Sequence, residues 1–158
     1  MTDLAPVAQY LTTIPIPHRL FRHARPCPFI GTGGAGTRGQ QPAQIVRSIL
    51  FRLAAAEYAM VLMAGPSQID WRALRRFVGQ SRLTTATEEE VLRVTGYPIG
   101  AVAPLACRGR CGCWSMKVAL AQAEVSIGSG VRGVTVILQV QDLMRALGEV
   151  EIGQFAQA

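Results

Sequence analysis

Two apolar runs indicate the fold: SILFRL, residues 48–53, and EYAMVLMAG, residues 57–65. Only a brief connector separates them. Apolar runs of strand length that are joined in this way predict a β-hairpin whose strands are buried. We therefore expect the two runs to form neighbouring strands of the main sheet.

The segments around the hairpin carry the signals of short helices and strands, without a regular βαβ repeat. A capping box from Thr87 to Glu90 predicts a helix that Gly96 ends, and residues 67–70 have similar spacing ahead of a helix that stops at Gly79. The other expected helices are residues 5–11, 42–46 and 140–148; the other expected strands are 18–23, 81–86, 123–128, 134–139 and 149–155, with loop and strand over 96–106.

This order of elements predicts one α+β domain over residues 1–158, with a central mixed, largely antiparallel sheet or partial barrel flanked by helices. Hydrophobic residues make up 49% of the chain, which excludes a disordered protein. No apolar run approaches the length of a membrane span, and the first residues include Asp3 but no basic region. We therefore expect a soluble cytoplasmic protein without a signal peptide.

The net charge of +6 is unevenly distributed. Residues 25–39 and 107–117 contain five of the 16 basic residues, none of the 10 acids and all four cysteines. Without these two segments the balance is 11 basic residues against 10 acids, or +1. A basic chain suggests an anionic partner such as nucleic acid, but here much of the excess charge belongs to two short segments.

The second of these segments, CRGRCGCWSMK, resembles a metal knuckle because its cysteines follow the pattern C-x3-C-x-C. Structural zinc sites usually combine two ligand pairs, and no second pair is present: Cys27 is isolated. His18 and His23 are five residues apart, so a strand would point them to opposite faces. We therefore expect no metal and no other cofactor, and a basic metal-binding module is the least favoured reading.

The stretch GYPIGAVAP, residues 96–104, is a better candidate for chemistry. Gly100 permits a close backbone approach or a positive φ, and Pro104 fixes the exit of the loop. Such a loop can direct successive N–H groups at a carbonyl oxygen and so form an oxyanion hole. The alternative is a plain turn between strands. No nucleophile elbow and no paired carboxylates accompany it.

Three segments in this order, QIVRSILF, TGYPIGAVAPL and SIGSGVRGVTVIL followed by QDL, closely resemble the YbaK/prolyl-tRNA synthetase editing-domain family. The resemblance extends from about residue 18 to the last predicted helix. It implies an α+β fold with a central mixed sheet, and hydrolysis of the ester of mischarged aminoacyl-tRNA, either in trans or as an inserted synthetase domain. The implied partners are the 3′ end of that tRNA and an aminoacyl-tRNA synthetase.

The resemblance also implies which residues form the site. The family's G-x-x-x-P loop, whose amides hold the substrate carbonyl, matches the stretch from Gly100 to Pro104. The implied catalytic residues are Arg47, Gly100 and Ala101; the implied substrate-binding residues are Phe21, His23, Ser48, Val102, Pro104, Ser129, Gly130, Arg132 and Thr135.

Arg47 departs from the family pattern, which has a lysine at this position before a small hydroxyl residue. An arginine stays charged and cannot exchange a proton as a lysine does, although it can clamp a phosphate or stabilise an oxyanion. Two readings follow. Hydrolysis can rely on positioned water and substrate groups with Arg47 as electrostatic support, or the protein binds aminoacyl-tRNA or a nucleotide without efficient turnover.

The resemblance fails only in residues 25–39 and 107–117, and back-translation offers a reason. One choice of codons for RPCPFIGTGGAGTR, read one base later, encodes GPVHSLEQAAQER, a helical stretch of the kind the family carries there. CRGRCGCWSMKV, read two bases later, encodes PRPLRVLVDES, which resembles the family's apolar strand. We interpret both segments as compensated frameshifts, in the gene or in its sequence record. Sequencing the gene tests this: stop codons in the shifted frame would exclude it.

Overall fold

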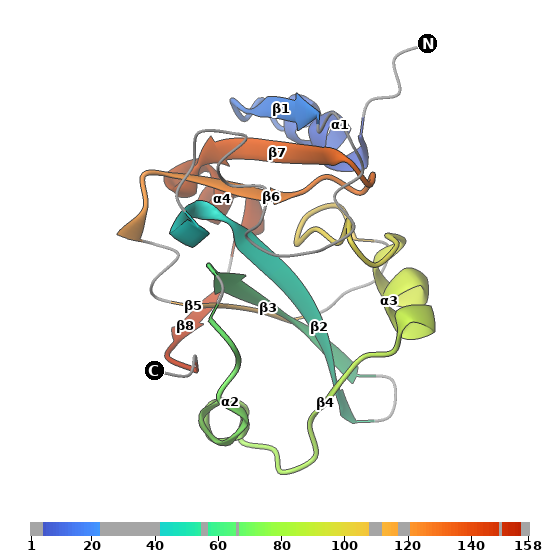
Figure 1. Cartoon of the computed structure of the whole chain (residues 1–158), viewed down its shortest axis with the longest axis vertical. Helices are drawn as coiled ribbons and strands as arrows, with labels where there is room; N and C mark the ends of the chain where they lie inside the picture. The colour runs from blue at the N-terminus through green and yellow to red at the C-terminus, as the bar shows by residue number, and fades with distance from the viewer. Residues whose placement is uncertain are drawn as a thin grey trace.

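The computed structural model describes residues 5–22, 42–54, 57–65, 67–107, 112–116, 121–148 and 150–155, with the backbone alone at residues 42, 54 and 112–116. The predicted hairpin is confirmed. Strand β2 (Val46–Ala54) pairs with β3 (Glu57–Ala64) in antiparallel register along nearly its whole length, from Val46 opposite Ala64 to Ala54 opposite Glu57. Figure 1 shows the two strands crossing the middle of the molecule.

The hairpin lies inside a five-stranded sheet with the order β4-β2-β3-β5-β8. Its other members are β4 (Thr84–Thr85), β5 (Gly112–Met116) and β8 (Glu151–Gly153). β5 runs parallel to β3, and β8 runs parallel to β5, so the sheet is mixed. The backbone of the cysteine-bearing segment thus forms an interior strand, whereas residues 25–39 lie outside the described residues.

A second sheet has three antiparallel strands in the order β1-β7-β6. They are β1 (Arg19–Arg22), β6 (Glu124–Gly128) and β7 (Val134–Gln139). One parallel bridge, from Ile45 to Ser126, links this sheet to the start of β2. The α+β class is confirmed, and the strands are mixed but largely antiparallel. The expected central sheet is divided in two because β6 meets β2 only at that bridge, and farther along β2 pairs with β4 and β3.

In the described part of the chain, four α-helices flank the sheets: α1 (Pro6–Thr13), α2 (Trp71–Val78), α3 (Glu88–Thr95) and α4 (Val140–Leu147). The capping box of α3 is confirmed, with Thr87 as N-cap and Gly96 in the left-handed conformation at the C-cap. The start predicted for α2 was wrong. Its N-cap is Asp70, whose carboxylate accepts a hydrogen bond from the Ala73 amide at 3.1 Å. No helix in the described part of the chain is long and apolar enough to cross a membrane.

Two other local predictions were also wrong. Residues 97–107 form a loop throughout, because turns at Gly100 and Ala106 use positive φ values and Pro104 has no N–H to donate to a strand. The expected helix over 42–46 shortens to one 3-10 turn, η3 (Pro42–Gln44), because Ile45 already bridges to Ser126.

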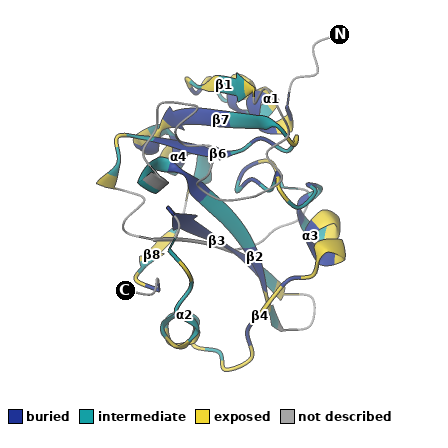
Figure 2. Ribbon diagram, in the orientation of Figure 1, coloured by how far each residue is buried: buried dark blue, intermediate teal, exposed yellow. Residues whose placement is uncertain are grey.

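Alternation along β2 divides the core into two clusters. Val46 and Leu50 face a cluster between the two sheets, which also takes side chains from β6, β7, α1 and α3. Phe51, on the opposite face of β2, packs in a second cluster beneath α2 with Leu74 and Phe155. β3 contributes to both clusters, which explains its unbroken apolar sequence, and Figure 2 shows it buried over most of its length.

The outer end of the hairpin is tied to α3 by Glu90, which is only 8% exposed. Tyr58 Oη donates to Glu90 Oε2 at 2.5 Å, the Thr87 amide donates to Oε1 at 3.0 Å, and Arg52 Nη1 lies 3.6 Å from Oε2. The hydrogen bond from Tyr58, followed by that from Thr87, lowers the pKa of Glu90 to about 2. The ionised carboxylate therefore stabilises the fold.

Because the pKa of Glu90 is lower in the folded state, its contribution to stability is complete above the ordinary value of 4.5 and is lost as pH falls towards about 2. We expect Glu90→Gln to lower the urea midpoint of unfolding at pH 7 and to flatten its decline between pH 4.5 and 2. Glu89→Gln, at an exposed position of the same helical turn, is the control. Parallel pH profiles for the wild type and Glu90→Gln would contradict this role.

Candidate active site

One face of the three-stranded sheet carries two of the predicted site residues, Phe21 and Thr135. Phe21 lies directly opposite Thr135, and Thr135 lies directly opposite Gly128, so all three share a face of the sheet. Ser126 joins them because it precedes Gly128 by two residues. The ion pair between Arg19 and Glu124, at 2.7 Å, spans the same face. We call the surface defined by Phe21, Thr135, Gly128 and Ser126 the Gly128 face.

Arg47 and Ser48 leave β2 on opposite sides. Ile45 pairs with Ser126 and so belongs to the side of the Gly128 face, and Arg47 follows it by two residues. Ser48 instead points to the side of Val46 and Leu50, which pack between the sheets. Its hydroxyl is buried and has no hydrogen-bond partner in the part of the chain that the structure describes. The two predicted residues therefore do not act on one ligand surface.

The Arg47 guanidinium binds the segment that connects β3 to α2. Nε donates to the Gly65 carbonyl at 3.0 Å, and Nη2 donates to the Ser67 carbonyl. Partial burial lowers the pKa of Arg47, although an arginine remains charged near neutral pH. The charge is thus held in a fixed position at the end of β3, on the side of β2 that corresponds to the Gly128 face, with two of its N–H donors engaged by the protein.

The G-x-x-x-P loop begins with a turn that requires Gly100. The Ala101 amide donates to the Pro98 carbonyl at 3.1 Å, and Gly100, at the third position of this turn, has a φ of 95°. Among the described residues, no backbone hydrogen bond uses the amides of Gly100, Val102 or Ala103. Ala103 is fully buried, so the donors that the loop can offer to a ligand are the amides of Gly100 and Val102, whereas that of Ala101 maintains the turn.

Tyr97 joins the two ends of the loop through hydrogen bonds of its hydroxyl. Its buried Oη lies 2.7 Å from the Leu105 carbonyl and 2.9 Å from the Ala106 carbonyl, and burial raises its pKa. The hydroxyl donates to these carbonyls at the far end of the loop, so one side chain joins the two ends. The conformation of the loop is thereby fixed before any ligand binds.

The turn GSGVRG, residues 128–133, supports the loop from the other side. The Gly130 amide donates to the Ala101 carbonyl at 2.9 Å, and Arg132 Nε donates to the Ile99 carbonyl at 2.9 Å. At Gly128 the two backbones touch: a Cβ there would lie 2.1 Å from the Val102 carbonyl oxygen. Glycine is thus required at position 128 for the loop to reach the Gly128 face.

Comparison with known proteins identifies the family. The model of the aminoacyl-tRNA editing domain matches residues 34–146. The chain belongs to this family. Relatives include the proline–tRNA ligase of Halalkalibacterium halodurans, 32% identical over 93 residues, and that of Kosmotoga olearia, 38% identical over 64 residues. These matches cover 59% and 40% of the chain, but only 15% and 11% of the ligases.

Solved structures agree in fold. A crystal structure of a proposed trans-editing enzyme for prolyl tRNA synthetase superposes with a TM-score of 0.87, covering 100% of this chain and 99% of the other at 22% identity. A hypothetical protein superposes with a TM-score of 0.84 at 20% identity, covering 96% and 99% of the two chains. At these identities the likeness establishes an editing-domain fold.

The editing domain brings together only some of the residues that its motifs suggested. Phe21, Thr135 and the G-x-x-x-P loop meet at the Gly128 face, and Arg47 lies beside it. Ser129 instead bonds within its own turn: its hydroxyl lies 2.7 Å from the Val134 carbonyl and accepts from the Val131 amide at 3.1 Å. His23 lies outside the described residues.

Cys107, in the cysteine-bearing segment, lies at the end of the same loop. Its Sγ donates to the Ala103 carbonyl at 3.3 Å, and Cys111 lies outside the described residues. In the described ranges, no three His, Cys, Asp or Glu side chains gather where they could hold a metal ion.

Two residues of the Gly128 face are absent from the sequence-based site. Gly128 could have been found, because a glycine inside a strand pattern often marks a close backbone approach. Ser126 gave no such signal. It is 1% exposed, and its hydroxyl has no partner within the described residues. A buried hydroxyl without a partner is uncommon in a folded protein, and a serine in an alternating strand does not reveal it by itself.

We expect Gly128→Ala to destabilise the editing domain by about 1–3 kcal/mol and to displace the loop, because the new Cβ and the Val102 carbonyl cannot share one space. Urea unfolding measures the first effect, and aminoacyl-ester hydrolysis measures the second. Gly79→Ala is the control: Gly79, unlike Gly128, has a positive φ, so the substitution strains the backbone, but its Cβ would meet no atom within 4 Å. Equal loss of hydrolysis in both variants would contradict a specific contact at Gly128.

Proposed function

We propose that this editing domain is an aminoacyl-tRNA deacylase that hydrolyses the ester of mischarged tRNA in trans. The observation that carries the proposal is the G-x-x-x-P loop, which Gly130, Arg132 and the close contact at Gly128 fix through its carbonyls. In the described residues, no backbone hydrogen bond uses the amides of Gly100 and Val102. Fixed N–H groups of this kind stabilise the oxyanion of acyl transfer, because they need no rearrangement during the reaction. The full-length likeness to a proposed trans-editing enzyme supports action in trans.

The proposed reaction needs only water as co-substrate. The ester carbonyl oxygen accepts hydrogen bonds from the amides of Gly100 and Val102, and the water oxygen attacks the carbonyl carbon. The bond from that carbon to the terminal ribose oxygen then breaks, and a proton from the water passes to the ribose oxygen. Free amino acid and tRNA are the products. The loop positions the carbonyl, and no metal is required.

Arg47 has a supporting role in this proposal. It cannot take the proton from water, because its guanidinium stays charged. Its bonds to the Gly65 and Ser67 carbonyls hold that charge in one orientation beside the Gly128 face. The charge can stabilise the developing oxyanion or the phosphate of the terminal nucleotide. The side chains of Phe21 and Thr135 would then contact the aminoacyl group.

The second candidate is a non-catalytic member of the family that binds aminoacyl-tRNA or a nucleotide. The observation that favours it is again Arg47, since a group able to exchange a proton is missing and two of its donors already bind the protein. The same surface would then hold the ligand without accelerating hydrolysis.

A panel of mischarged tRNAs separates the two functions. We expect the purified protein to release amino acid from at least one mischarged tRNA, faster than the uncatalysed ester hydrolyses, and to leave correctly charged tRNA intact. Binding of the mischarged tRNA without release of amino acid would contradict the deacylase and support the second candidate.

Substitution of Arg47 tests its role. We expect Arg47→Met to lower the deacylation rate at least ~10-fold, because the positive charge is lost, and Arg47→Lys to retain most of the rate. Both variants lose bonds to the Gly65 and Ser67 carbonyls, so urea unfolding of each separates an effect on stability from one on rate. A faster Arg47→Lys variant would show that a proton-exchanging group limits turnover, and equal rates in all three proteins would contradict the electrostatic role.

A further inference from the structure

Helix α2 and the turn after it carry a concentration of positive charge that the proposed reaction does not use. Outside residues 25–39 and 107–117, the chain has 11 basic residues and 10 acids. Residues 71–87 hold four of those basic residues, namely Arg72, Arg75, Arg76 and Arg82, and no acid. Without residues 25–39, 107–117 and 71–87, the chain has seven basic residues against 10 acids. The net charge of that remainder is negative, so the positive charge is concentrated in residues 71–87.

Three of these arginines form one exposed helix face. Arg72, Arg75 and Arg76 are exposed and are spaced at i, i+3 and i+4, so they project from the same side of α2. In the described residues, the ion pairs join other arginines to acids, and none involves this face. Like charges at this spacing weaken a helix. Arg75 and Arg76 lie in the last turn of α2, where a positive charge is favourable, but Arg72 lies in the first turn, where it is not. Helix stability therefore does not explain Arg72, and we call the three residues the α2 arginine face.

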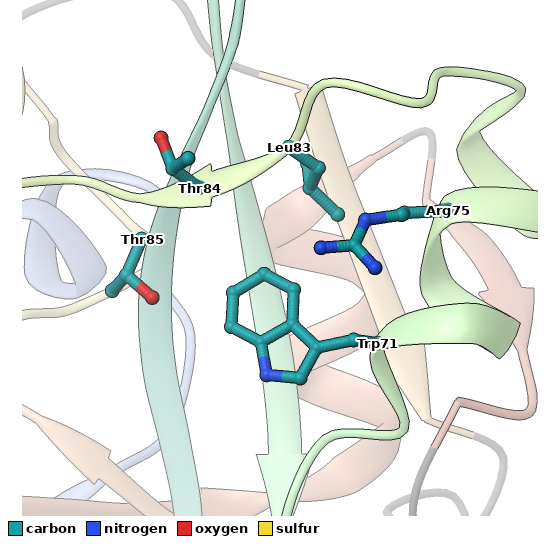
Figure 3. A pocket seen from close by; sticks show the side chains of 5 residues that line it. All are labelled: Trp71, Arg75, Leu83, Thr84 and Thr85. Carbon is teal, nitrogen blue, oxygen red and sulfur yellow. The ribbon is translucent and has the colours of Figure 1, made fainter.

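A hollow of about 410 Å³ adjoins this face, and Figure 3 shows the side chains that line it. Arg75 lies over Trp71, with its guanidinium carbon 5.5 Å from the ring centroid, and Trp71 in turn packs edge-on against Phe51. Thr84 and Thr85, both exposed, line the same hollow, and the hydroxyl of Thr85 points to the side of Trp71 whereas that of Thr84 points away from it. A cation stacked on an indole, next to a hydroxyl, is suited to a sugar-phosphate chain.

The α2 arginine face and the candidate site are connected along one side of β2. Ile45 bridges to the Gly128 face, Arg47 follows on the same side, and Phe51 lies under Trp71. These six residue steps of strand span about 20 Å. In Figure 1, α2 lies at the opposite end of the molecule from β1 and β7. A small ligand at the Gly128 face cannot reach α2, whereas a nucleic acid can span both.

We propose that the α2 arginine face docks the phosphate backbone of an RNA duplex. This inference rests on the proposed function: the duplex is the helical stem next to the 3′ end whose ester is hydrolysed at the Gly128 face. Contacts to phosphates position a helix without reading its sequence, and double-stranded RNA is recognised largely through its backbone. The α2 arginine face therefore contributes affinity for the duplex and orients it, while the G-x-x-x-P loop acts on the ester.

Salt dependence of tRNA binding tests the proposal. Uncharged tRNA is titrated with the wild type, with Arg72→Gln/Arg76→Gln, and with the control Arg22→Gln/Arg145→Gln, which removes the same charge at exposed positions elsewhere. Each lost phosphate contact reduces the slope of log K against log salt by about 0.7–0.9. We expect the α2 variant to bind tRNA more weakly than the wild type. The ratio of the two dissociation constants should fall about 10-fold between 50 and 200 mM salt. The control should keep the wild-type slope.

Equal slopes for the α2 variant and the control would overturn the proposal, and so would binding of an acidic protein by this face with no binding of RNA. Hydrolysis assays distinguish this failure from failure of the proposed function. A mischarged 3′-terminal fragment too short to reach α2 should be hydrolysed equally by all three proteins, whereas full tRNA should show the α2 defect. If no protein hydrolyses the fragment, the deacylase is wrong, but the salt slopes still decide whether RNA docks on α2.

Discussion

The contact between Gly128 and the Val102 carbonyl is the constraint on which the site depends. A Cβ at position 128 would lie 2.1 Å from that oxygen, so the loop can approach the sheet only across a residue without a side chain. The hydrogen bonds from Gly130 and Arg132 then fix the loop, and Tyr97 joins its ends. The loop is thereby fixed against the sheet before a ligand arrives, and within the described residues the amides of Gly100 and Val102 make no backbone hydrogen bond.

The two faces of strand β2 have different roles in this arrangement. One of its faces builds the core between the sheets through Val46 and Leu50, while the other leads from Ile45 past Arg47 to the cluster beneath α2. Arg47 lies where these regions meet and binds the carbonyls of the β3–α2 connection. An arginine suits this position better than a lysine, because its planar fork can donate in two directions at once. Its structural role thus bears directly on its departure from the family pattern.

Much of the fold could be predicted from short-range patterns. The hairpin follows from two apolar runs, and α3 follows from a capping box whose partners, Thr87 and Glu90, are three residues apart. Prediction failed where a distant contact decides between local options. Asp70 caps α2 although Ser67 offers a hydroxyl at similar spacing, and the Asp70 amide donates to the Phe155 carbonyl from the far end of the chain. No local pattern contains that bond.

The sequence by itself determined the motifs, the family and the stretch that forms the loop, because glycines, prolines and capping residues act on their immediate neighbours. Only the tertiary structure decided which residues share a surface: Arg47 lies beside the Gly128 face, Ser48 points into the core, and Ser129 bonds within its own turn. It also brought Gly128 and Ser126 into the site. The physical reason is that the side a strand residue faces is fixed by pairing with strands far along the chain, and a one-residue shift of that pairing would reverse it.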